Sequence, residues 1–212
     1  YDGSTTAPLY VYPVKDGIAG ERIVNFDEKI FKKLKALGNN VERGEPNEVD
    51  VFEYIYGALY NPDYREDFAE FLSLDFPRVP WPDTPAEFWM FADKGRALKN
   101  LHLMLDSAVG KTSYPLTGAE GGGLVEAARF EDSKIWISEK QYFDGVTEET
   151  WETYFGGYQP LQKRLKDRKK RKLSFEDVKT YQKIIRIVVE TNRIMGEIKK
   201  AGTVAAESEE LA

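Results

Sequence analysis

The chain carries, from Gly156 to Glu190, the sequence GGYQPLQKRLKDRKKRKLSFEDVKTYQKIIRIVVE, which joins a dense run of cations to a long helical pattern. Ser174 and Asp177 have the spacing of a capping box, in which two side chains satisfy free backbone N–H groups where a helix begins. Apolar residues then recur at helical spacing on two sides, which is typical of a buried helix. The stretch predicts a short helix over 160–169 and a long buried helix from Ser174 to about Lys200.

The rest of the chain alternates between helical and strand-like patterns. Before residue 107, the patterns predict a strand and then four helices, at 9–13, 25–37, 48–60, from 62 onward, and from 84 to about 106. From Lys111 to Phe143 the sequence is rich in Gly, Thr, Val and aromatic residues. This composition predicts short strands near 112–116, 123–130 and 134–138, with a turn at 131–133. This order predicts an α+β fold in which helices flank a small, mostly antiparallel sheet and a long buried C-terminal helix ends the domain. We expect one domain over 1–200 and a flexible acidic tail over 201–212.

The composition excludes several classes of site. Cysteine is absent, which removes disulfides, thiolate metal sites and cysteine nucleophiles, and which favours a reducing, cytoplasmic setting. The single histidine, His102, lies in a helical pattern among leucines and is interpreted as a packing residue. No run of 18 apolar residues predicts a membrane helix. Because the chain does not begin with Met, we expect it to be a fragment of a longer polypeptide.

Three short motifs resemble parts of catalytic sites, but each is incomplete. Residues 61–64 read Asn-Pro-Asp-Tyr, close to an amino-methyltransferase motif, yet an Asn cap followed by Pro at the first helical position explains them. Residues 110–112 match only the end of a phosphate-binding loop. Residues 197–199 resemble the tail of a nuclease motif without a matching strand carboxylate. The sequence therefore predicts no catalytic residue, metal site or cofactor site in this chain.

The run of cations is the strongest functional signal. Eight of the ten residues from 163 to 172 are basic, although the chain has a formal net charge of −6. Cations near the end of a helix complement its dipole, but that accounts for two or three of them. Phosphates of a polyanion would supply the missing counter-charge. We therefore predict phosphate contacts by eight residues, namely Lys163, Arg164, Lys166, Arg168, Lys169, Lys170, Arg171 and Lys172.

Several strings along the chain, in this order and spacing, resemble those of one family. They are YIYGALY at 54–60 with NPDYR at 61–65, LDFPRVP at 74–80, GYQPLQK at 157–163 with LKDR at 165–168, and LSFED at 173–177 with YQK at 181–183. Together they resemble the C-terminal specificity, or target-recognition, domain of Type ISP restriction-modification enzymes and related single-chain adenine-N6 DNA methyltransferases. The resemblance covers about Leu9 to Lys200. The chain departs from the family at Lys170, where glycine is frequent, and this departure predicts a differently shaped loop with one more cation.

The resemblance implies a function in bacterial DNA modification. The chain would recognise double-stranded DNA, while an upstream methyltransferase domain of the same polypeptide would flip and methylate an adenine with S-adenosylmethionine. Since phosphate contacts position a protein and base contacts specify the sequence, base readers are expected mainly in the strand region 112–143. The residues named as base readers are Lys140, Gln141, Tyr142 and Gln159. The alternative is a protein-interaction module, whose basic run and final helix would bind an acidic partner.

Overall fold

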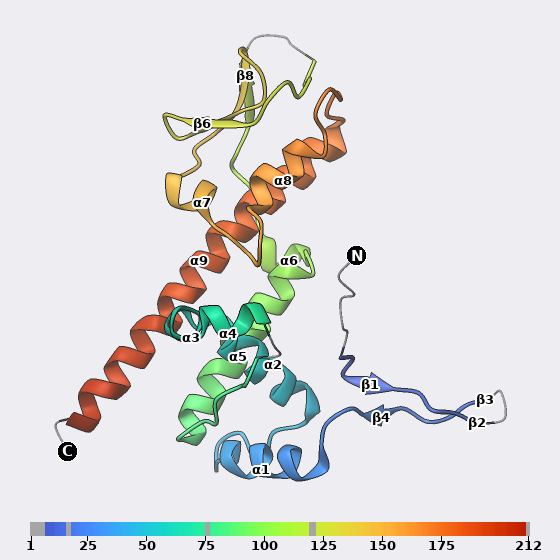
Figure 1. Cartoon of the computed structure of the whole chain (residues 1–212), viewed down its shortest axis with the longest axis vertical. Coiled ribbons are helices and arrows are strands. Elements are labelled where there is room, and N and C mark those ends of the chain that lie inside the picture. Colours follow the sequence, from blue (N-terminus) through green and yellow to red (C-terminus); the bar gives the residue numbers. More distant parts are fainter. Residues whose placement is uncertain (1–6, 16–17, 75–76, 119–121, 211–212) are drawn as a thin grey trace. The chain divides into compact units, whose positions relative to one another are not determined.

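The computed structural model describes residues 7–15, 18–74, 77–118 and 122–210, and the chain divides into two compact units (Figure 1). Unit 1 comprises Tyr1–Lys99 and Glu197–Ala212, and unit 2 comprises Asn100–Gly196. Helices combine with small antiparallel sheets, which confirms the predicted α+β class. The long C-terminal helix is also confirmed; it is α9 (Phe175–Glu210), and it extends past the predicted end near Lys200.

Unit 1 begins with two antiparallel strand pairs and continues with helices. Strand β1 (Tyr10–Val11) pairs with β4 (Ile23–Val24), and β2 (Val14–Lys15) pairs with β3 (Ile18–Ala19), whereas the sequence predicted only the first strand. The helices are α1 (Glu28–Gly38), α2 (Glu48–Ala58), α3 (Pro62–Asp67), α4 (Ala69–Leu74) and most of α5 (Pro85–His102). The helix predicted from Pro62 is interrupted at Phe68 and so forms two helices. The Asn61 side chain accepts a hydrogen bond from Asp63 N, so the Asn-Pro-Asp-Tyr string is a helix cap.

Helices α2 and α5 approach so closely that their contact requires glycine. A Cβ on Gly95 would lie 1.8 Å from the Glu53 carbonyl oxygen, and one on Gly57 would lie 2.1 Å from the Phe91 carbonyl oxygen. Beside this contact, the buried ring of Tyr54 stacks on Phe88 with centroids 4.9 Å apart. Small residues thus let the two backbones meet while aromatic rings fill the adjoining core.

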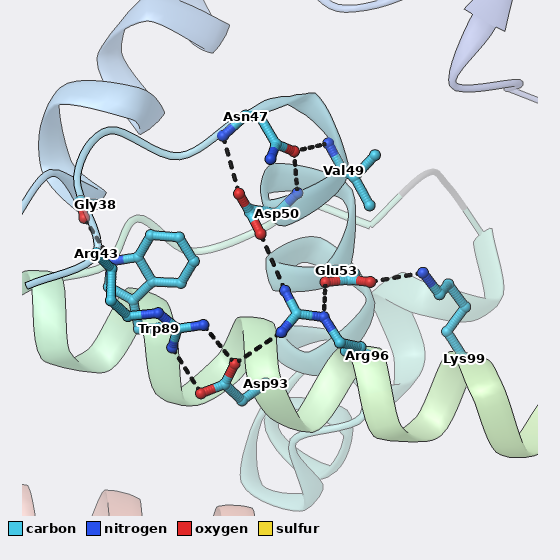
Figure 2. Close-up of polar contacts among 10 residues, drawn as sticks. All are labelled: Gly38, Arg43, Asn47, Val49, Asp50, Glu53, Trp89, Asp93, Arg96 and Lys99. Atoms are coloured by element: carbon cyan, nitrogen blue, oxygen red, sulfur yellow. Dashed lines mark hydrogen bonds and ion pairs between the residues drawn. The ribbon is translucent and has the colours of Figure 1, made fainter. Parts of the chain in front are cut away.

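A network of charged side chains joins the same two helices (Figure 2). Glu53 is 1% exposed, and its carboxylate accepts from Arg96 Nε at 2.7 Å and from Lys99 Nζ at 2.6 Å. The Arg96 guanidinium also pairs with Asp50 and Asp93. Asp93 in turn accepts two hydrogen bonds from Arg43. The buried carboxylate is therefore compensated by two cations, as burial of a charge requires.

Unit 2 contains a four-stranded antiparallel sheet with the order β5-β8-β7-β6. The strands are β5 (Leu116–Gly118), β6 (Arg129–Glu131), β7 (Lys134–Trp136) and β8 (Gln141–Asp144). The turn predicted at 131–133 joins β6 to β7, and Asp132 and Ser133 adopt positive φ angles there. Strand β8 was not predicted as a separate strand, although it is central to the sheet.

Helices of unit 2 share a hydrophobic core with this sheet. They are α7 (Glu148–Glu152), α8 (Pro160–Lys166) and the first part of α9, and unit 2 also contains the short helix α6 (Asp106–Val109). Ile135 and Phe143 of the sheet share a core with Leu161 of α8 and with Tyr181 and Ile185 of α9. An apolar stripe of α9 is thus used inside unit 2.

Two predicted helix ends are wrong, and backbone conformation explains both. Helix α5 ends at His102 rather than near residue 106, because Met104 adopts φ +56°. Helix α8 ends at Lys166 rather than Lys169, since the chain turns back toward a neighbouring segment, with Lys170 at φ +64°. His102 packs as interpreted, with Nε2 3.0 Å from Thr191 Oγ1, and burial lowers the pKa of its imidazole.

Candidate nucleic-acid interface

Helix α8 is fixed on the core of unit 2 by its apolar side. Leu161 and Leu165 are fully buried, and the Tyr181 hydroxyl donates to the Leu161 carbonyl oxygen at 3.1 Å. Pro160 occupies the first turn, where the missing N–H leaves no hydrogen bond unmade. Because the leucines face the core, Lys163 and Lys166 of the same helix are exposed. The predicted helix therefore presents these two lysines to solvent.

Residues 167–173, here called the basic loop, follow α8 and pair with residues 123–125. Lys170 N donates to the Val125 carbonyl oxygen at 2.8 Å, and Val125 N donates to that of Arg171 at 3.0 Å. Leu173 N donates to the Gly123 carbonyl oxygen at 2.9 Å. These backbone hydrogen bonds join the basic run to the strand region, two segments that the sequence analysis treated separately.

Lys170 adopts a backbone conformation that is uncommon for a residue with a side chain. Its φ of +64° lies in the left-handed region that glycine favours. Lysine at this position therefore adopts a backbone conformation suited to glycine, and the difference in loop shape from other family members stays a prediction. The lysine adds an exposed cation at a strained position.

Asp177 fastens the other side of the basic loop. Its carboxylate accepts from Arg168 Nε at 2.8 Å and from the Ser174 N–H and hydroxyl, and Asp177 N donates to Ser174 Oγ. The predicted capping box is thus confirmed. Hydrogen bonds from Arg168 and then from Ser174 lower the pKa of Asp177 to about 2. Arg164 lies 3.9 Å from the same carboxylate, and its pKa is lowered by burial and by the nearby Arg168.

The eight predicted phosphate contacts fall into two groups. Arg164 and Arg168 are half-buried beside Asp177, and Lys163 pairs with Asp167 one helical turn away. The other five are exposed and form no ion pair within the described ranges; they are Lys166, Lys169, Lys170, Arg171 and Lys172. The structure thus separates cations that hold the loop from cations that remain available to a ligand.

The four residues named as base readers lie in different environments. Lys140 is exposed. Gln141 is half-buried, and its Oε1 accepts from Gly123 N at 2.9 Å, directly beside the basic loop. The Tyr142 ring packs against Trp136, with centroids 4.6 Å apart. Gln159 lies elsewhere, where its Nε2 donates to Glu152 at 2.9 Å. Gln141 therefore contacts a residue that pairs with the basic loop, and Gln159 has a different neighbourhood.

The outward face of the sheet carries Arg129, Lys134 and Trp136, which the sequence analysis did not single out, beside Tyr142, which it did. The Arg129 guanidinium lies 4.8 Å from the centre of the Trp136 ring, and Lys134 Nζ lies 5.0 Å from that of Tyr142. Trp136 Nε1 is buried without a hydrogen-bond partner in the described part of the chain. Alternation around the buried Ile135 could have revealed this face, because neighbours in a strand point to opposite sides.

The sequence matches the Type ISP C-terminal specificity domain over residues 1–197. The chain therefore belongs to this family, as the resemblance implied. No curated protein matches the sequence.

Solved structures share the fold. The chain is similar to one in the cryo-EM structure of the DrdV–DNA complex, with a TM-score of 0.68 and 23% identity over 90% of this chain. It is similar also to the ATP-dependent Type ISP restriction-modification enzyme LlaBIII bound to DNA, with a TM-score of 0.67 and 16% identity over 90% of this chain. A nuclease-deletion mutant of the Type ISP enzyme LlaGI, in complex with a DNA substrate mimic, gives a TM-score of 0.55 and 17% identity over 73%. The chain spans 21% of the DrdV chain and 14% of each of the other two.

The described ranges lack two other features. No helix there has the length and apolar character needed to cross a membrane. No group of three or more His, Asp or Glu side chains is placed to hold a metal ion among those residues.

Proposed function

We propose that this chain recognises a target sequence in double-stranded DNA as the specificity domain of a bacterial restriction-modification or modification enzyme. The observation that carries the proposal is the set of five exposed cations on and beside the basic loop, which form no ion pair among the described residues, in a chain of net charge −6. Membership of the Type ISP specificity-domain family supports it, as do relatives whose structures were solved with DNA.

The physical basis is local charge on a fixed backbone. Each lysine or arginine that meets a phosphate releases condensed counterions from the duplex, so binding weakens steeply as salt rises. The basic loop is held by residues 123–125 on one side and by Asp177 on the other. A loop held in this way orders its cations before binding, which lowers the entropy lost when they meet phosphates.

The proposal extends to the parent polypeptide. The chain would position duplex DNA for adenine-N6 methylation, and for cleavage where the parent restricts, by domains that precede it. S-adenosylmethionine would bind in the methyltransferase domain, and the enzyme would act in the bacterial cytoplasm. This chain spans only a small part of DrdV, LlaBIII and LlaGI, which supports the proposal that other domains carry out methylation and cleavage.

The test is the salt dependence of duplex binding. Replacing Lys169, Lys170 and Arg171 together with Ala should weaken binding to every duplex and make the slope of log K against log salt shallower by about 2 to 3, since each phosphate contact contributes about 0.9. The matched control replaces three exposed lysines of unit 1, Lys29, Lys32 and Lys200, and should leave the slope almost unchanged. An unchanged slope in the loop variant would exclude the phosphate role.

One observation supports the alternative function, in which the chain is a module that binds an acidic protein. Phe175, two residues after the basic loop, is 79% exposed, as an apolar contact for a protein would be. The final helix no longer favours this alternative, because Tyr181, Ile185 and Val188 are buried in the core of unit 2. Competition at moderate salt separates the two functions: duplex DNA should displace a bound acidic protein, and the reverse result would favour the protein partner.

A further inference from the structure

Gln141 stands at the junction between strand β8 and the basic loop. Its Oε1 accepts from Gly123 N at 2.9 Å, and the carbonyl oxygen of the same Gly123 accepts from Leu173 N at 2.9 Å. Gly123 is therefore held by the sheet through its N–H and by the basic loop through its C=O. One side-chain amide thus connects the strand region to the loop that carries the exposed cations.

Gly123 has a backbone conformation that a side chain would not favour. Its φ of +71° suits glycine, and the added Cβ of any other residue would lie 3.2 Å from the Leu173 carbonyl oxygen. Glycine has no side chain with which to hold itself in place, and it has wide backbone freedom. The hydrogen bond from Gln141 restricts that freedom where residues 123–125 pair with the basic loop.

We propose that Gln141 is a positioning residue that holds the basic loop in its phosphate-binding arrangement, and not a reader of base edges. This inference rests on the proposed function. A glutamine that reads adenine must offer its Oε1 as an acceptor to the exocyclic amine and its Nε2 as a donor. In this structure Oε1 already accepts from Gly123 N, and turning it toward a base would release the junction. The Gln141 amide therefore holds the basic loop in place through Gly123 and Leu173. It affects DNA binding by positioning the cations of the loop that contact phosphates.

The experiment uses the whole 212-residue chain and the variant Gln141→Met, which keeps the length of the side chain and removes its acceptor. Affinity is measured against a duplex of random sequence across a salt series, and sequence preference is measured by selection from a randomised duplex library. The variant should bind the random duplex about fivefold more weakly, as expected for one lost hydrogen bond. Its salt slope should be shallower, while the selected sequence should stay the same.

A matched control separates positioning from general loss of stability. Gln182 on α9 also makes a side-chain hydrogen bond to backbone, from Nε2 to the Tyr114 carbonyl oxygen at 2.9 Å, and within the described ranges it forms no hydrogen bond to the basic loop. Gln182→Met should lower the midpoint of thermal unfolding by an amount similar to Gln141→Met and leave the salt slope unchanged. Equal effects of both variants on DNA binding would overturn the inference.

A double-mutant cycle completes the test. If Gln141 acts through the loop, Gln141→Met should change affinity little once Lys169, Lys170 and Arg171 are already Ala. Additive losses would overturn the inference, as would a changed sequence preference at unchanged affinity for random duplex, since that result identifies a base reader. These outcomes leave the proposed function standing. Absence of duplex binding by the unmodified chain at low salt would instead refute the proposed function, and the inference with it.

Discussion

The Arg168 guanidinium donates from Nε to Asp177 Oδ1 at 2.8 Å, and so it ties the basic loop to the first turn of α9. The same carboxylate accepts from Ser174 N and thereby completes the helix cap. One acidic residue thus serves two purposes, since it stabilises the start of the longest helix and neutralises a cation that would otherwise repel its neighbours.

The first prediction concerns Asp177 and pH. Its pKa in the folded chain is lowered to about 2, mainly by Arg168, and is about 3.9 for an unfolded aspartate. A lowered pKa means that the carboxylate stabilises the fold fully above about pH 4 to 5, and that this contribution is lost as pH falls toward 2. Asp177→Asn should reduce the free energy of unfolding by about 1 kcal/mol at pH 7. The difference from the unmodified chain should shrink in urea titrations below pH 4.

A suitable control for this prediction is Asp106→Asn. Asp106 pairs with Lys183 at 2.6 Å, but its side chain is 87% exposed, and exposed ion pairs contribute little. Its replacement should therefore change the unfolding free energy much less than Asp177→Asn does at pH 7. A constant difference between Asp177→Asn and the unmodified chain from pH 7 to pH 2 would contradict the assignment.

The second prediction separates stability from DNA binding at Lys170. Because its φ is +64°, Lys170→Gly should stabilise the fold by about 1 kcal/mol. The same change removes an exposed cation, so the salt slope of duplex binding should become shallower by about 0.9. Ser133→Gly is the matched control, because Ser133 has φ +58° in the turn between β6 and β7. It should raise stability similarly and leave DNA binding unchanged; a Lys170→Gly variant that binds DNA as well as the unmodified chain would disprove the phosphate contact.

The third prediction concerns the ion network of unit 1, where removing the buried anion and removing its cations should lower the free energy of unfolding by different amounts. Glu53 is 2% exposed at its side chain, whereas Arg96 and Lys99 are 40% and 26% exposed. Glu53→Gln leaves two cations that can reach water, and it should cost about 1 to 2 kcal/mol. Replacing Arg96 and Lys99 together with Met leaves a buried, unpaired carboxylate, and it should cost about 3 to 5 kcal/mol. Urea unfolding followed by circular dichroism measures both, and the opposite order would show that the carboxylate is hydrated.

Local signals in the sequence predicted part of this structure well. The capping box at Ser174 and Asp177, the Asn61 cap and the turn at 131–133 were found because each depends on residues within one turn of the chain. The α8 end, by contrast, depends on hydrogen bonds from the basic loop to residues 123–125, which lie far away in sequence. Helical spacing carries no information about such pairings.

The sequence predicted which residues carry the positive charge of the candidate site, but it did not predict how those residues are arranged in space. Charge density alone identified residues 163–172. It did not reveal that Arg168 is paired with Asp177 while Lys170 forms no ion pair in the part of the chain that the structure describes. It also did not reveal that Gln141 contacts Gly123, because those differences arise from tertiary contacts. The acidic residues near a basic run are therefore as informative as the cations themselves.

The last prediction tests the close approach of α2 and α5. In Gly95→Ala, the new Cβ would lie 1.8 Å from the Glu53 carbonyl oxygen and 2.7 Å from Gly57 N, both of them backbone atoms that move only with their helix. The helices must separate, which should cost about 3 kcal/mol, more than alanine gains over glycine in helix propensity, about 1 kcal/mol. Gly196→Ala in α9 is the matched control, because nothing lies within 4 Å of its added Cβ. Thermal unfolding should show the midpoint lowered by Gly95→Ala and raised by Gly196→Ala; shifts of the same sign would mean that the α2–α5 contact adapts without separation.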